Sequence, residues 1–302
     1  MKTRLRIIIS LLLGYLSYGQ QEAQFTNYMY NTINVNPAYA GSRGVMSIFG
    51  LYRTQWVGLE GAPDTGTFSI NTPFENSRLG LGLSFINDRI GPTTTNNISA
   101  DISYTIPTSE TWKLSFGVKG SASLFSLDPN KLTAVQGDPN LTPINNDLTP
   151  NVGAGIYFHN SKSYVGFSIP YMLQTTRYND NSRAVYMERM HYYLIAGHVF
   201  DLSSSVKFKP AILGKATEGA PIAVDATANF MFNEKFILGG AYRWSAAWSA
   251  LAGFQVNNNL FIGYGYDRET TKLQHYNSGS HEIFVRYEFA KKNDKIISPR
   301  FF

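Results

Sequence analysis

Residues 79–85 read Leu-Gly-Leu-Gly-Leu-Ser-Phe. Large apolar residues occupy every second position and glycine or serine the positions between them. A period of two places the two sets on opposite faces of a β-strand, whereas an amphipathic helix has a period of 3.6. Residues 112–118 repeat the pattern, with Trp112, Leu114 and Phe116 alternating with Lys113 and Ser115. Both stretches therefore predict strands with one apolar face.

The same alternation recurs from residue 45 to residue 289. It predicts about fourteen strands, at residues 45–53, 67–74, 79–85, 98–106, 112–118, 152–158, 164–169, 191–200, 206–213, 222–232, 235–242, 249–256, 260–266 and 282–289.

The connections between these strands alternate between long and short. Long loops are expected near residues 58, 88, 127, 170, 215, 243 and 267, and short turns near residues 75, 108, 160, 201, 233 and 257. The periodicity alone also permits a soluble sandwich. Long outer loops that alternate with short periplasmic turns, around an even number of strands, are typical of bacterial outer-membrane barrels. We therefore expect an all-β fold, a transmembrane antiparallel β-barrel whose first strand runs outward from the periplasm.

The composition agrees with a barrel. Charged residues make up 16% and aromatic residues 14% of the 302 residues, and there are 26 glycines. The mean hydropathy of −0.17 excludes a bundle of membrane-spanning helices. Without cysteine, the chain forms no disulfide and no thiolate metal site.

Residues 1–19 have the pattern of a secretory signal peptide. Lys2, Arg4 and Arg6 precede an apolar run from residue 7 to residue 16, and small residues stand at positions 17 and 19. The alternative, a membrane anchor, requires a longer apolar run. Removal of these three basic residues lowers the formal charge from +5 to +2, which argues against nucleic acid as a partner.

Residues 24–41 fit neither the strand period nor the helix period. They carry no charge and are rich in asparagine and tyrosine, whose polar groups suit the inside of a barrel. We expect residues 20–42 to plug the lumen, residues 43–290 to form the barrel and residues 291–302 to form a periplasmic tail. The alternative for residues 20–42 is a disordered periplasmic segment. The candidate plug or gate residues are Asn27, Tyr28, Tyr30, Asn34, Asn36, Pro37 and Tyr39.

The sequence shows no motif for catalysis, for a metal or for a cofactor. The five histidines lack zinc-binding spacing, and there is no Gly-x-Ser-x-Gly or phosphate-binding loop. We therefore expect a protein that is not an enzyme. Arginine and tryptophan at the outer strand ends fit an interfacial belt or a rim that binds a partner. The candidate rim residues are Arg53, Trp56, Arg243, Trp244 and Arg268.

Eight distinctive blocks of sequence run in order along the chain after residue 19: residues 24–31, 36–41, 53–56, 61–63, 82–91, 265–267, 279–283 and 298–302. Together these blocks resemble the PorP/SprF family of type IX secretion system membrane proteins. Two positions depart from the family pattern. Thr32 stands where the family often has proline, and Arg268-Glu269 replaces small residues in a loop.

The resemblance implies a FadL-like barrel in the cell outer membrane that works with type IX secretion and gliding components. Some members of the family support the export or surface retention of a secreted adhesin, whose C-terminal sorting domain they engage. The implied partners are such an adhesin-like protein, other secretion components and outer-membrane lipid. The alternative is a FadL-like transporter for small hydrophobic molecules. Four lysines on the expected inner face argue against an oily conduit: Lys113, Lys119, Lys207 and Lys209.

Overall fold

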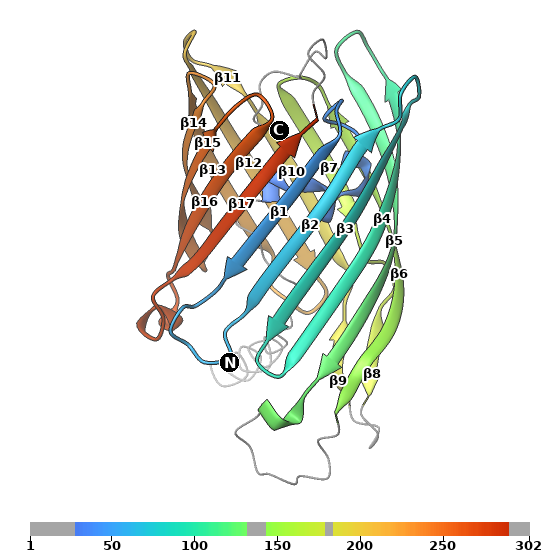
Figure 1. Ribbon diagram of the computed structural model, residues 1–302, viewed down its shortest axis with the longest axis vertical. Helices are drawn as coiled ribbons and strands as arrows, with labels where there is room; N and C mark the ends of the chain where they lie inside the picture. The colour runs from blue at the N-terminus through green and yellow to red at the C-terminus, as the bar shows by residue number, and fades with distance from the viewer. Residues whose placement is uncertain (1–27, 132–142, 179–183, 290–302) are drawn as a thin grey trace, which may run out of the picture.

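A computed structural model describes residues 28–131, 143–178 and 184–289 of the chain. The expected signal peptide, Asn27 and the expected C-terminal tail lie outside these residues. Within them, a wall of strands surrounds a short N-terminal segment (Figure 1).

Fourteen strands form the wall in the part of the chain that the structure describes. They are β1 (Ser47–Thr54), β2 (Asp64–Pro73), β3 (Leu79–Ile90), β4 (Thr93–Pro107), β5 (Lys113–Leu127), β6 (Ile144–His159), β7 (Ser163–Ile169), β10 (His191–His198), β12 (Val206–Thr217), β13 (Ala223–Phe232), β14 (Phe236–Arg243), β15 (Ala247–Gln255), β16 (Leu260–Glu269) and β17 (Ser280–Glu288). A two-residue strand, β11 (Phe200–Asp201), continues the pairing of β10 with β12.

The wall is closed. Each strand pairs antiparallel with its neighbours in sequence, β1 also pairs with β17, and β10 pairs with both β7 and β12. Closure satisfies the backbone hydrogen bonds that an open sheet would expose to lipid. The expected antiparallel barrel and its strand number are confirmed.

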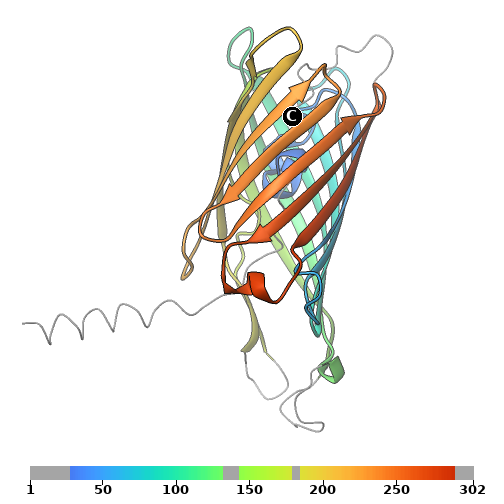
Figure 2. The same ribbon diagram turned by 90° about the vertical axis from the view of Figure 1, so that its left-hand side faces the viewer.

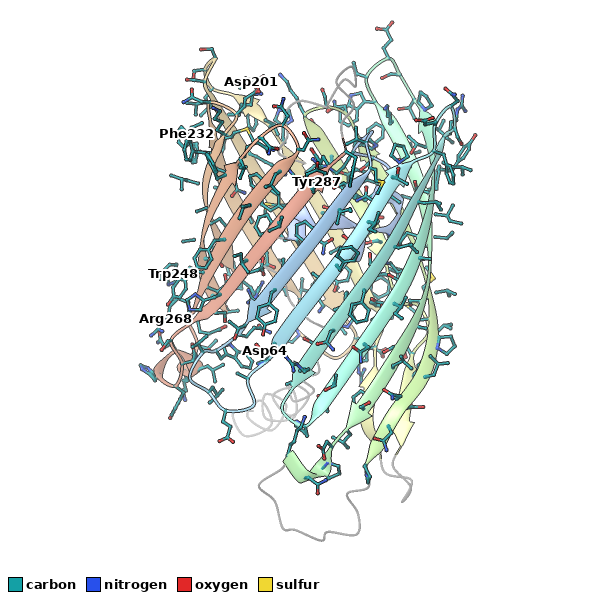
Figure 3. The ribbon with its side chains drawn as sticks, viewed as in Figure 1. Asp64, Asp201, Phe232, Trp248, Arg268 and Tyr287 are labelled. Carbon is teal, nitrogen blue, oxygen red and sulfur yellow. The ribbon has the colours of Figure 1, made fainter. Side chains whose placement is uncertain are left out.

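The two faces of the wall differ as the alternation predicts. On β5, Phe116 and Val118 are exposed on the outside, whereas Ser115 and Lys119 are buried inside. On β3, the leucine and phenylalanine positions face outward and the glycines face inward. Figure 3 shows outward Trp248 near one end of the wall and Tyr287 near the other. Aromatic residues at both ends are a feature of membrane barrels, where they lie at the two lipid interfaces.

Long loops gather at one end of the barrel and short turns at the other (Figure 1). Two expected loops are shorter than the sequence indicated. The expected loop at residues 88–95 is largely strand, because β3 reaches Ile90 and β4 begins at Thr93. The expected loop at residues 127–150 ends early, because β6 begins at Ile144. In these stretches most residues on both faces of the strands are polar, so the apolar alternation that marks a strand is interrupted.

The long connection after β7 contains a two-stranded hairpin that the sequence did not reveal, β8 (Thr175–Tyr178) and β9 (Ala184–Glu188). The hairpin extends beyond the wall at the long-loop end (Figure 2). The remaining short elements are helical turns: η1 (Tyr28–Tyr30), α2 (Thr32–Val35), η2 (Pro37–Tyr39), η3 (Pro129–Lys131) and η4 (Lys272–His275). None of the helices described has the length and apolar character needed to cross a membrane.

Candidate functional site

The N-terminal segment lies inside the barrel. Residues 28–40, which we call the lumen segment, form the three turns η1, α2 and η2, and every one of these residues is buried. Both ribbon views place these turns within the ring of strands (Figures 1 and 2). Turns this short are not stable by themselves in water, so contacts with the wall must hold them.

The inner wall has glycine where the lumen segment comes closest. A Cβ added at Gly82 would overlap the side chain of Ile33, and one at Gly117 would overlap the backbone of Pro37 and Ala38. A Cβ at Gly155 would overlap the amide of Asn36. Three strands, β3, β5 and β6, therefore leave room for the segment by omitting side chains. Close approach of a second backbone is a common reason for glycine within a strand.

Asn36 joins the lumen segment to β6. Its Nδ2 donates to the carbonyl oxygen of Ile156 at 2.9 Å. Its Oδ1 accepts from the backbone N–H of Ala38, also at 2.9 Å, and so caps η2. Asparagine is one of the preferred residues at this capping position. One fully buried amide thus fixes a turn and anchors it to β6.

Asn31 and Asn34 bind another part of the wall, four strands away from β6. The Nδ2 of Asn34 donates to Oγ1 of Thr67 at 2.9 Å, and Oγ of Ser69 donates to Oδ1 of Asn31 at 3.1 Å. Both wall residues lie on β2. The asparagines therefore pair with inward hydroxyl groups, as a polar lumen requires of buried amides.

Tyrosines of the lumen segment pack against aromatic rings of the wall. The ring of Tyr30 stacks on Phe284 at a centroid distance of 4.8 Å and on Phe261 at 5.5 Å. The guanidinium of Arg286 lies 5.8 Å from the centre of the Tyr30 ring. Tyr39 packs edge-on against Tyr157 at 5.6 Å. Aromatic pairs of this kind add about 0.5–1.5 kcal/mol each beyond the burial of their surface.

Two buried ion pairs flank the segment. Lys119 Nζ lies 3.1 Å from Oδ1 of Asp101 and also donates to the carbonyl oxygen of Ile33 at 3.5 Å. Arg43, just after the segment, pairs with Glu288 at the end of β17. The first pair connects wall and segment, and the second ties the exit of the segment to the last strand.

Six of the seven predicted plug residues lie together in the lumen segment and are buried, and the seventh, Asn27, is outside the described residues. Asn34, Asn36, Tyr30 and Tyr39 make the contacts given above. Sequence reasoning missed the inward glycines as contact sites. The alternation of glycine with large apolar residues predicts that the glycines face inward. It does not predict that the lumen segment packs against them.

The predicted rim residues lie in different environments. Arg53 is buried, with a side chain that is 2% exposed, and pairs with Asp267 at 2.6 Å and with Glu282 at 3.2 Å. Trp56 has a positive φ of 47°, and its Nε1 donates to Glu269 at 3.0 Å. Together these contacts connect the end of β1 to β16 and β17.

The other three rim residues lie near the loops at the same end. Arg243 pairs with Asp225 at 2.8 Å. Arg268 donates to the carbonyl oxygens of Asn277 and Gln274 and so holds the loop before β17. Trp244 is 70% exposed. Of the five, Trp244 is the side chain most available to a partner, and contact with a partner stays a prediction for all of them.

The family comparison decides the identity of the chain. The model of the type IX secretion system membrane protein family PorP/SprF matches residues 17–287, which include every wall strand except the last residue of β17. The chain belongs to the PorP/SprF family. It is accordingly an outer-membrane protein with a role in type IX secretion. No curated protein sequence matches the chain.

Solved structures with the same fold include a hydrocarbon channel and a toluene transporter. The TodX deltaS2S3 mutant monoaromatic hydrocarbon channel is 9% identical, with a TM-score of 0.50 over 85% of this chain and 94% of that one. The toluene transporter TbuX of Ralstonia pickettii is also 9% identical, with a TM-score of 0.50 over 86% of this chain and 92% of that one. At this identity the likeness concerns the fold alone.

Proposed function

We propose that this PorP/SprF barrel is a non-enzymatic docking protein of the type IX secretion and gliding machinery. Its long loops bind the C-terminal sorting domain of a secreted, adhesin-like partner and support the export or surface anchoring of that partner. The lumen segment closes the barrel beneath the docking face. Family membership supports the secretion role, and the surface of the long-loop end supports the docking role.

The observation that carries the docking proposal is a set of exposed apolar side chains on four different loops. Trp244 and Tyr276 are each 70% exposed, Ile222 is 69% exposed and Leu59 is 36% exposed. All four lie in connections at the long-loop end, which faces away from the periplasm in outer-membrane barrels. Exposed aromatic side chains are common anchors of protein interfaces. We call these four residues the loop anchors.

Backbone hydrogen bonds join the two loops that carry Leu59 and Tyr276. The backbone N–H of Val57 donates to the carbonyl oxygen of Gly279 at 2.9 Å, and that of Ser278 donates to Val57 at 2.8 Å. These bonds join the loop after β1 to the loop before β17. Beneath them lies the buried group of Arg53, Asp267 and Glu282. A preformed surface loses less conformational entropy when it binds a partner.

Replacing Trp244 and Tyr276 with aspartate is expected to release the secreted partner. The test is co-purification from detergent-solubilised outer membranes with a tagged chain. The control replaces Leu202 and Val256, which are exposed on short turns at the opposite end of the barrel, with aspartate. Loss of an interface hot spot typically costs about 2–4 kcal/mol, or roughly a 30- to 900-fold weaker complex. Equal partner recovery from both variants, with intact barrels, would contradict docking through these loops.

The alternative function is a channel for small hydrophobic molecules, which the shared fold with a hydrocarbon channel and a toluene transporter permits. The lumen argues against it. The Lys119–Asp101 pair and the Arg53 group are buried charges on the inner wall, and hydrophobic ligands are bound by mostly apolar linings. Uptake of a labelled aromatic hydrocarbon into liposomes that contain the chain, above the rate for empty liposomes, would favour the alternative.

A further inference from the structure

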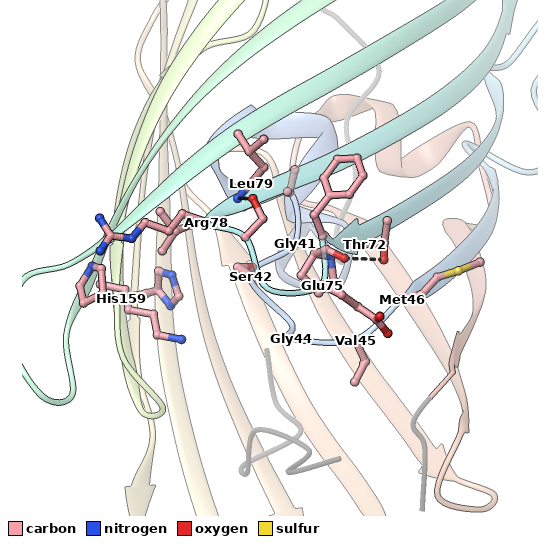
Figure 4. A pocket seen from close by; sticks show the side chains of 18 of the residues that line it. Gly41, Ser42, Gly44, Val45, Met46, Thr72, Glu75, Arg78, Leu79 and His159 are labelled. Carbon is pink, nitrogen blue, oxygen red and sulfur yellow. Dashed lines mark hydrogen bonds between the residues drawn. The ribbon is translucent and has the colours of Figure 1, made fainter. Parts of the chain in front are cut away.

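A cavity of about 690 Å³ lies at the short-turn end of the barrel. We call it the mouth pocket. One wall is the exit loop, residues 41–46, which runs from the lumen segment to β1, and another is the turn between β2 and β3. The ends of β4, β5 and β6 complete it (Figure 4). Short turns face the periplasm in outer-membrane barrels, so the pocket opens to that side.

Cationic and imidazole groups gather on one side of the mouth pocket. Arg78, Lys113 and His159 line it, and Lys113 is the direct cross-strand partner of His159 between β5 and β6. Glu75 also lines the pocket, and Figure 4 shows it on the other side, away from Arg78 and His159. One side of the cavity therefore carries a local excess of positive charge.

His159 gives an independent sign of a ligand. The residue is buried, with 7% of its surface exposed, and among the described residues its Nε2 has no hydrogen-bond partner. The ring stacks on Tyr157 at 4.9 Å, which fixes its plane. A buried polar atom without a partner is costly and uncommon in a folded protein. The His159 ring lines the mouth pocket next to Lys113, so a carboxylate bound there would lie close to both the imidazole and the ammonium group.

We propose that the mouth pocket binds an acidic segment of a periplasmic polypeptide. A free small anion does not account for its size, since cavities of about 300–1,000 Å³ usually hold larger ligands. Apolar side chains of Met46, Phe74 and Phe289 also line it. The ligand therefore carries both carboxylates and apolar groups. This site lies at the opposite end of the barrel from the loop anchors, so it does not depend on the docking function proposed above.

The site also touches the chain that leads to the lumen segment. Ala40, whose carbonyl oxygen accepts from Ser103 at 2.7 Å, lines the mouth pocket together with the exit loop. A polypeptide bound here contacts the end of the lumen segment directly. Binding at the periplasmic face and the position of the segment are thus physically connected.

The test measures fluorescence anisotropy of a labelled short peptide of alternating glutamate and leucine with the purified full chain in detergent. The acidic peptide is expected to bind, and the matching lysine–leucine peptide is not. Lys113→Glu is expected to weaken binding about tenfold, because a close charge pair becomes a repulsion. The control Lys235→Glu makes the same change on an exposed turn at the same end and is expected to alter binding less than about twofold.

Three outcomes would overturn the proposal. Equal weakening by the two substitutions would show that only the overall charge matters. Equal binding of the lysine peptide would exclude recognition of carboxylates. Inorganic phosphate that binds to the wild-type chain but not to Lys113→Glu, with no binding of the acidic peptide, would indicate a site for a free small anion. Heat-dependent migration on gels confirms in each case that the barrel is folded.

Discussion

Replacing Gly117 with phenylalanine is expected to displace the lumen segment and to raise the conductance of the barrel for small ions. Even a single added Cβ at this position overlaps the backbone of Pro37 and Ala38. Overpacking of a filled site typically costs about 1–3 kcal/mol. If that cost falls on the closed state, the open fraction rises roughly 5- to 150-fold. The measurement is single-channel conductance in planar lipid bilayers.

Gly120 provides a matched control on the same strand. It is exposed on the outer face of β5, and a Cβ added there meets no atom within 4 Å. Gly120→Phe therefore adds the same side chain three residues further along β5, on the outer face and away from the segment, and is expected to leave conductance unchanged. A chain that lacks residues 20–42 is expected to conduct at least as well as Gly117→Phe, or to lose the secreted partner. If all three behave like the wild type, residues 20–42 do not control the lumen.

The barrel could be predicted from the sequence because one face of each strand contacts lipid and the other faces the polar lumen. Within the membrane, lipid selects leucine and phenylalanine outside and the lumen selects glycine, serine and lysine inside, so residues 79–85 and 112–118 alternate strictly. Beyond the membrane, both faces of a strand meet water. The end of β3 and the start of β4 therefore carry no apolar alternation. For that reason the sequence pattern predicts a loop where the structure has two strands.

The contacts of the candidate site could be predicted only in part. The asparagines and tyrosines of the lumen segment are unusual enough to suggest a polar interior. Their partners lie far away in sequence: Asn36 binds Ile156, and Asn34 binds Thr67. Which inward residues meet them depends on the register of closure, which no local pattern encodes. The partners of Arg53 could not be predicted for the same reason. Its two buried carboxylates lie on β16 and β17, which meet β1 only when the barrel closes.

The placement of Arg53 separates two roles that the sequence could not distinguish. An arginine at a strand end suits a rim that binds a partner, but its side chain is 2% exposed and pairs with Asp267 and Glu282. It therefore connects β1 to β16 and β17 beneath the loops that carry Leu59 and Tyr276. A substitution at Arg53 should act first on the stability of the barrel and only through it on binding.

Arg53→Met is expected to destabilise the barrel by about 3–5 kcal/mol, because it leaves the buried carboxylates of Asp267 and Glu282 without this cation. The measurement is equilibrium unfolding in guanidinium in detergent micelles. The triple variant Arg53→Met, Asp267→Asn, Glu282→Gln removes both carboxylates as well and is expected to recover most of the loss, since none of the three charges of this group remains.

Lys235→Met is a control for the lost charge, because this lysine is exposed on the turn between β13 and β14. It is expected to change the free energy of unfolding by no more than about 0.5 kcal/mol. If Arg53→Met is equally mild, the ion pairs do not hold the first strand to the last two. If the triple variant is as unstable as the single one, the loss comes from packing of the arginine stem rather than from its charge. Recovery in the triple variant would show that charge compensation at the seam of β1, β16 and β17 stabilises the base of the loop surface.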